Sequence, residues 1–158
     1  MGGYSVERSI SVNAPAHLVH GLVNDFHSWT SWSPWEDLDP DLQRAYSGSD
    51  EGVGARYEWQ GNRKAGHGSM VITGSTPEGI DITVEFLKPF RATNQTRFDI
   101  APSGNGTQVR WVMTGEQKGV MSLLGKVYSM DKMIGPDFEK GLTRLKAVAE
   151  ETDGSPAG

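Results

Sequence analysis

The stretch Ile134-Gly-Pro-Asp-Phe138-Glu-Lys-Gly-Leu142-Thr-Arg-Leu145-Lys-Ala-Val-Ala149 decides the fold. Its large apolar residues and Ala149 recur at steps of 4, 4, 3 and 4, which is the spacing of one face of an α-helix. The residues between them are largely charged, so this helix is expected to bury one stripe and expose the other. Gly135-Pro136 stands near its start, and because proline removes a helix hydrogen bond, we expect a hinge or a fresh helix start there.

Upstream of this helix the chain alternates apolar and polar residues in short runs, as half-buried strands do. Turn sequences separate the runs, the strongest being Asn105-Gly106. We expect strands at 4–12, 42–48, 53–60, 66–74, 79–87, 92–101 and 107–116, and a short helix from about 16 to 23. Apolar residues share one face of these strands and charged residues the other, which predicts an antiparallel sheet covered on one side.

The expected fold class is α+β, with a seven-stranded curved antiparallel sheet wrapped around the long C-terminal helix. A helix of about 15 residues spans only about 22 Å. It cannot cover seven flat strands about 4.8 Å apart. The sheet must therefore curl, and curling leaves a cavity that Tyr57, Trp59, Phe86 and Trp111 fill only in part. Residues 1–151 are expected to form a single ligand-binding domain, and residues 152–158 a flexible tail.

Composition bounds the function. The chain has 158 residues and no cysteine, which excludes disulfides, thiolate metal sites and cysteine nucleophiles. Its formal net charge of −5 argues against a nucleic-acid partner. No apolar run reaches the roughly 20 residues of a membrane span, and the first residues lack a signal-peptide core. We therefore expect a cytoplasmic protein with no nucleic-acid partner and no integral membrane association.

Motifs for metals and cofactors fail on spacing. His17 and His20 are three residues apart, but no third ligand stands near them in the sequence. The acidic stretch 36–41 lacks the glycine and the glutamate of a calcium loop. The segment 119–126 has the wrong interval for a phosphate-binding loop. We expect neither a metal nor a cofactor.

Four short motifs and the order of the elements resemble the START-like (SRPBCC) superfamily, of the polyketide cyclase/dehydrase type. The motifs are Ala14-Pro15 after the first strand, Trp32-Ser-Pro-Trp35, Gly106-Thr107 entering a strand that ends at Trp111, and Gly141-Leu142 followed by Leu145-Lys146. The resemblance covers residues 4–151. It implies the helix-grip architecture and a cavity for apolar or amphipathic ligands. Members share no catalytic residue set, so no catalytic residue is carried over.

The candidate ligand-binding residues are those that face the expected cavity. Arg8 shares the phase of Val6 and Ile10, so it must be paired, point outwards or bind an anionic ligand group. Tyr57, Asn94 and Thr96 are the other polar groups that could orient a ligand. The apolar candidates are Trp35, Trp59, Met70, Ile82, Phe86, Phe98, Trp111, Met113, Leu124, Tyr128, Ile134 and Phe138.

Three functions remain open. The first is a binding protein for a hydrophobic or amphipathic small molecule (a lipid, a polyketide or an aromatic compound), acting as a monomer or weak homodimer. The second is a polyketide cyclase or aromatase-type enzyme using the same cavity, with His67 as the candidate base, although strict alternation turns His67 towards water. The third is an interaction module that docks a partner through exposed Trp29–Trp35 or through residues 120–133, which are equally candidates for a gate over the cavity or an ordinary packed helix end.

Overall fold

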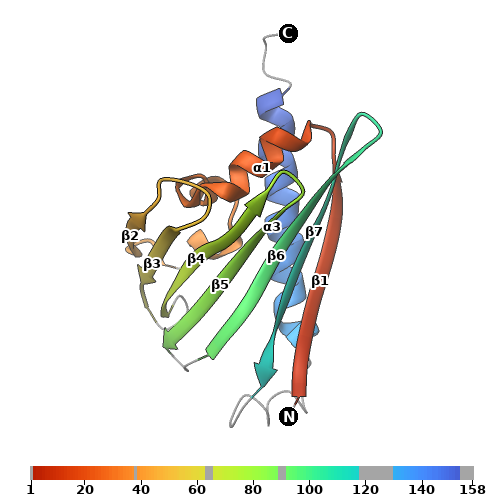
Figure 1. Cartoon of the computed structure of the whole chain (residues 1–158). Helices are drawn as coiled ribbons and strands as arrows, with labels where there is room; N and C mark the ends of the chain where they lie inside the picture. The colour runs from red at the N-terminus through yellow and green to blue at the C-terminus, as the bar shows by residue number, and fades with distance from the viewer. Residues whose placement is uncertain (1, 38, 63–65, 89–91, 118–129, 154–158) are drawn as a thin grey trace.

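The computed structural model describes residues 2–37, 39–62, 66–88, 92–117 and 130–153. This part of the chain forms a seven-stranded antiparallel sheet in the order β1-β7-β6-β5-β4-β3-β2. One long helix crosses the concave face of the sheet and a short one lies at one end of it (Figure 1). The expected α+β helix-grip fold is confirmed.

The elements follow the predicted order. The strands are β1 (Gly2–Val12), β2 (Gln43–Gly48), β3 (Ala55–Gln60), β4 (His67–Thr76), β5 (Gly79–Lys88), β6 (Ala92–Ser103) and β7 (Gly106–Gln117). The helices are α1 (Ala16–Asn24), the short 3-10 helices η1 (Phe26–Ser31) and η2 (Pro34–Asp37), and α3 (Met130–Asp153). The alternating hydropathy therefore located every strand of the described sheet to within a few residues.

The helix α3 runs without interruption through Pro136, so the expected hinge at Gly135-Pro136 is wrong. The proline deprives only the carbonyl of Lys132 of its intrahelical partner, and its own side chain is exposed. Ile134 and Phe138 flank it on the apolar stripe and both pack into the core. This packing on both sides holds the helix together across the missing hydrogen bond.

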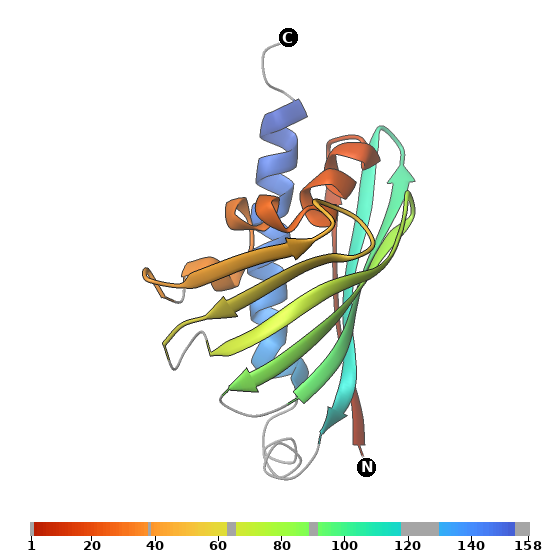
Figure 2. The same ribbon diagram turned by 60° about the vertical axis from the view of Figure 1, so that its left-hand side comes forward.

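The position of α3 against the sheet is asymmetric. Its backbone comes closest to the edge strand β1, and it also contacts α1, η1 and η2. The sheet curls around it, with β2 and β3 on the far side from β1 (Figure 2). The helix thus lies along one flank of the concave face, and side chains alone bridge the distance to the middle strands.

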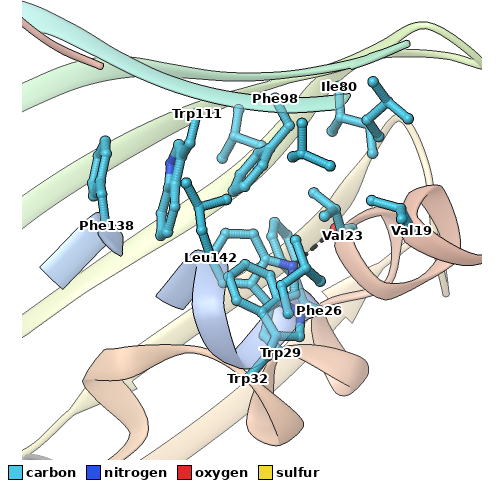
Figure 3. Close-up of a cluster of buried hydrophobic side chains, with 14 of the residues drawn as sticks. Val19, Val23, Phe26, Trp29, Trp32, Ile80, Phe98, Trp111, Phe138 and Leu142 are labelled. Carbon is cyan, nitrogen blue, oxygen red and sulfur yellow. Dashed lines mark hydrogen bonds between the residues drawn. The ribbon is translucent and has the colours of Figure 1, made fainter. Parts of the chain in front are cut away.

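An aromatic stack joins the sheet to the helix. The ring of Trp111 on β7 lies parallel to that of Phe138 on α3, with centroids 4.0 Å apart, and stacks on Phe98 of β6 with centroids 4.7 Å apart. Figure 3 shows these rings beside Trp29 and Trp32 from the η1 segment. All five side chains are at least 95% buried.

Trp29 and Trp32 belong to this core and not to a surface. Trp29 is 5% exposed and Trp32 is 0% exposed. Their indole nitrogens donate hydrogen bonds to the carbonyls of Val23 and Leu22 at the end of α1. The docking surface expected from the spacing of these tryptophans is therefore wrong. The other docking or gating candidate is the segment 120–133. Its residues 120–129 lie outside the described residues, and residues 130–133 belong to the start of α3.

The convex face carries a chain of ion pairs across four strands. Arg97 on β6 pairs with Asp81 on β5 at 2.8 Å and with Asp99 at 2.6 Å. Arg110 on β7 continues the chain to Asp99 at 3.0 Å and to Glu7 on β1 at 2.6 Å. We call these five residues the convex ion ladder. The hydrogen bond from Arg110 lowers the pKa of the Glu7 carboxyl below its ordinary value.

Replacing Pro136 by alanine should stabilise the protein. The change restores the hydrogen bond to Lys132 and removes a ring clash, together about 3 kcal/mol in a helix interior. It also raises the conformational entropy of the unfolded chain, which reduces the gain in stability by about 1 kcal/mol. Urea denaturation should therefore show a gain of about 2 kcal/mol in the free energy of unfolding. A loss of stability would contradict an uninterrupted helix at this position.

The convex ion ladder makes stability depend on acid pH. Because the pKa of Glu7 is lower in the folded than in the unfolded chain, its contribution is complete above about pH 4.3 and disappears as pH falls through the folded value. Urea denaturation between pH 7 and pH 3 should show a smaller loss of stability for Glu7→Gln than for the unchanged protein. The exposed Glu78→Gln is the control and should behave as the unchanged protein does.

Candidate functional site

The inner face of the sheet is organised in rows of residues that are directly opposite one another on neighbouring strands. We name four rows on β3–β7 after one member each. They are the Trp111 row (Ile80, Phe98, Trp111), the Thr96 row (Ile72, Ile82, Thr96, Met113), the Asn94 row (Tyr57, Met70, Val84, Asn94, Gly115) and the Phe86 row (Trp59, Gly68, Phe86, Ala92).

The most exposed side chains of the inner face belong to the Asn94 and Phe86 rows. Members of the Trp111 row are at most 1% exposed, while Thr96 and Met113 reach 5% and 6%. In the Asn94 row Val84 is 8% exposed and Met70 is only partly buried. In the Phe86 row Trp59 and Phe86 are both partly exposed. The inner face is therefore sealed at the α1 end and incompletely covered at the other.

Three elements account for this difference. The α1 helix packs over β5 and β6, η1 packs on β3, and α3 follows β1. Together with the aromatic stack they fill the space over the Trp111 row (Figure 3). Ile134, in the second turn of α3, is itself only partly buried. The apolar side chains of the Phe86 row thus present accessible surface next to Met70, and Ile134 presents some on α3.

Trp59 forms a wall at this end. A methyl group on Gly68 would come within 2.6 Å of the Trp59 ring, so the indole lies directly over that glycine. The ring then meets Phe86 edge to face, with centroids 5.6 Å apart. On its other side Trp59 stacks with Tyr57 at 6.1 Å. Gly68 is needed here because no side chain fits beneath the indole.

The polar groups of the inner face are few and buried. Asn94 is 3% exposed and Thr96 is 5% exposed. The Thr96 hydroxyl donates to Asn94 Oδ1 at 3.3 Å. Within the described chain the Asn94 amide nitrogen has no acceptor, and the buried Trp111 Nε1 has none either. Only the Trp111 nitrogen is completely buried without a partner, where an unmet hydrogen bond is costly, whereas the Asn94 amide keeps a small accessible surface.

Arg8 stands at the β1 edge, directly opposite Trp111. Its Nε donates to Glu139 on α3 at 2.7 Å, and its Nη1 donates to the Glu7 carbonyl at 2.8 Å. The guanidinium crosses α3 at Gly135, where a methyl group would lie 2.7 Å from Cζ. Arg8 is thus one partner of an ion pair between β1 and α3.

The remaining candidate residues lie in the core, on the outer side of the sheet or outside the described residues. Trp35 packs edge to face on Trp111, with centroids 5.6 Å apart, and belongs with Phe98 and Phe138 to the filled part of the interface. His67 lies on the outward phase with Ser69, next to a register shift between His67 and Gly68. Leu124 and Tyr128 lie outside the described residues.

Sequence reasoning missed several features of this face. Val84 has the same alternation phase as Ile82 and Phe86 but is not among the candidate ligand-binding residues. Gly68 and Gly115 carry no hydropathy signal, and only the strand register shows that they belong to the inner rows. It also missed a pocket of about 140 Å³ on the other flank, at the junction of η1 with β2 and β3, bordered by His27, Tyr46 and Arg56. That volume is below the roughly 300 Å³ of ordinary ligand sites.

The described residues contain no group of three or more histidine, aspartate or glutamate side chains placed to hold a metal ion. No helix among them has the length and apolar character needed to cross a membrane.

The chain belongs to the family described as polyketide cyclase / dehydrase and lipid transport, because the sequence profile of that family matches residues 4–150. This agrees with the resemblance found in the sequence and with the helix-grip fold. The family combines ligand carriers and enzymes, so membership supports a fold for hydrophobic ligand binding or cyclisation. A search of curated proteins finds no match for this chain.

Solved structures confirm the fold. A protein of Chromobacterium violaceum superposes with a TM-score of 0.67 and 16% identity, covering 92% of this chain and 96% of that one. A protein of Mesorhizobium loti gives 0.65 and 16%, covering 94% and 98%. The di-domain ARO/CYC protein StfQ of the steffimycin biosynthetic pathway gives 0.69 and 13%, covering 96% of this chain and 52% of its own length.

Substituting Gly68 by alanine should disturb the wall formed by Trp59. The new methyl group would lie 2.4 Å from the Glu85 carbonyl and 2.6 Å from the indole, so backbone or ring must move. We expect a loss of about 1–3 kcal/mol in unfolding free energy and a shifted tryptophan emission maximum. Gly21→Ala, with nothing nearby, is the control and should gain about 0.5–1 kcal/mol. Unchanged emission in Gly68→Ala would contradict this packing.

Proposed function

We propose that this protein binds a hydrophobic or amphipathic small molecule on the inner face of the sheet, at the end occupied by the Asn94 and Phe86 rows. The observation that carries the proposal is the greater exposure of these two rows. Large apolar side chains that face the concave interior are normally buried completely. Here Trp59, Met70, Phe86 and Ile134 stay partly exposed together, as the lining of a ligand site does.

The proposed ligand-binding residues are those of the open end. Trp59, Met70, Val84, Phe86 and Ile134 would supply apolar contact, which contributes about 25 cal/mol per Å² of buried surface. Asn94 and Thr96 would orient the ligand. The rings of Phe98, Trp111 and Phe138 form the floor, since they already fill the space behind the Thr96 row.

The family description, which names lipid transport beside cyclases, is compatible with this role. The similar StfQ protein is described as an ARO/CYC of a biosynthetic pathway, so a cyclase is the alternative function. A cyclase needs a proton-transfer group next to its substrate. His67, the candidate base, is on the outward phase, so binding is the function that the geometry favours.

The binding proposal is tested with the uncharged fluorophore N-phenyl-1-naphthylamine, whose emission rises in apolar surroundings. The unchanged protein should bind it saturably in a 1:1 complex. Met70→Arg places a charge at the proposed site while its long stem can still reach solvent, and should weaken binding about tenfold or more. Thr73→Arg, exposed on the opposite phase of β4, should bind normally. Absence of binding, or equal losses in both variants, would refute the proposal.

A further inference from the structure

We infer that the ligand is uncharged and carries a carbonyl or hydroxyl oxygen, which accepts a hydrogen bond from the Asn94 side-chain amide. This inference rests on the proposed function and narrows it. It separates neutral ketones, quinones, phenols and alcohols from fatty acids and other carboxylates. Three observations carry it: the unused donors of the inner face, the absence of charge in its rows and the ion pair that engages Arg8.

The unused groups on the inner face are donors. The Asn94 oxygen already accepts from the Thr96 hydroxyl at 3.3 Å, which leaves the amide N–H groups for another acceptor. Asn94 is 3% exposed, and its amide nitrogen is not among the completely buried unpartnered atoms of the described chain, so it keeps a small accessible surface on the inner face that a ligand atom can contact. Gly115, directly opposite Asn94 on β7, has no side chain that could accept from the amide. A ligand oxygen beside Asn94 would satisfy the amide.

The Trp111 indole nitrogen is a second donor, two rows further in. It is buried and has no partner in the described chain. Trp111 lies beside Phe98 in the register, and Phe98, Thr96 and Asn94 follow one another on the inner phase of β6. Two N–H donors without a partner therefore lie along this line of the interior, and a ligand oxygen that accepts a hydrogen bond would pair with the one nearer the open end.

Charge is missing from the four rows on β3–β7, and the Phe86 row continues on β2 to the exposed Arg44, directly opposite Trp59. None of their members on β3–β7 is acidic or basic, and the facing α3 residues Ile134, Phe138 and Leu142 are apolar. A carboxylate bound there would lose its hydration without gaining a counter-ion, which is a large free-energy cost. A neutral carbonyl or hydroxyl loses much less and recovers it through the hydrogen bond from Asn94.

Two arginines on edge strands are in register with the inner rows: Arg44 on β2, which is exposed, and Arg8 on β1, which is partly buried and therefore the stronger challenge to this reasoning. The Arg8 guanidinium is held by the Glu139 carboxylate at 2.7 Å and by the Glu7 carbonyl at 2.8 Å. It also lies against Gly135, on the far side of the aromatic stack from β4 and β5. Binding an anion through Arg8 would require breaking its ion pair with Glu139, so an anionic ligand gains little from it.

The test uses three anthracenes of nearly equal shape at pH 7.5: 9-acetylanthracene, 9-ethylanthracene and 9-anthracenecarboxylate. Each is titrated into the unchanged protein, into Asn94→Leu and into Thr96→Val, with folding checked by circular dichroism. We expect the acetyl compound to bind about tenfold tighter than the carboxylate and several-fold tighter than the ethyl compound. Asn94→Leu should abolish the preference for acetyl over ethyl without weakening the ethyl compound.

The outcomes separate the two proposals. If none of the three compounds binds the unchanged protein, the proposed function itself fails. If the ethyl compound binds but the carboxylate equals or exceeds the acetyl compound, binding stands and the inference of a neutral ligand is overturned. Should Asn94→Leu not fold, Thr96→Val takes its place: it frees the Asn94 oxygen from its donor and should reduce the preference for acetyl, whereas an unchanged preference counts against Asn94 as the anchor.

Discussion

The parallel contact between the rings of Trp111 and Phe138 is the interaction on which the remaining architecture depends. It joins β7, the neighbour of the edge strand β1, to a helix whose backbone follows β1. Gly141 makes this approach possible, because a methyl group there would lie 2.9 Å from both Trp111 and Pro34. Once the helix is fixed at this contact, its distance from β3, β4 and β5 is fixed as well, and so is the space that side chains must fill.

One end of that space is filled and the other is accessible, because most of the large aromatic side chains lie at the first end. Trp29 and Trp32 enter from the segment after α1 and pack against the Trp111 row, where their nitrogens find backbone carbonyls. Beyond the Asn94 row the described chain brings no equivalent group, and Trp59 lies flat over Gly68 instead of reaching across to α3. A sealed core and an accessible apolar end therefore follow from one arrangement of aromatic residues.

Periodicity predicted most of the fold, because the strands alternate strictly and the stripe on α3 is regular. It failed at Pro136, where local propensity argued for a break and tertiary packing on Ile134 and Phe138 outweighed it. For the site, the alternation of apolar and polar residues identified which side chains face the inner side of the sheet. It could not distinguish the side chains of the filled interior from those at the accessible end. That distinction depends on strand register and on the placement of α3, and the glycines that shape the Trp59 wall have no hydropathy for a pattern to detect.

The ion ladder on the convex surface has a mechanical consequence. Its ion pairs link β1, β7, β6 and β5 in addition to their backbone pairing, and sliding any of these strands would separate paired charges. The strands β2, β3 and β4 lie outside it, and β4 meets β5 with two irregularities of register. The ladder therefore adds charged links to one side of the sheet only, and β2, β3 and β4 are joined to it through strand pairing and the packing of their inner side chains.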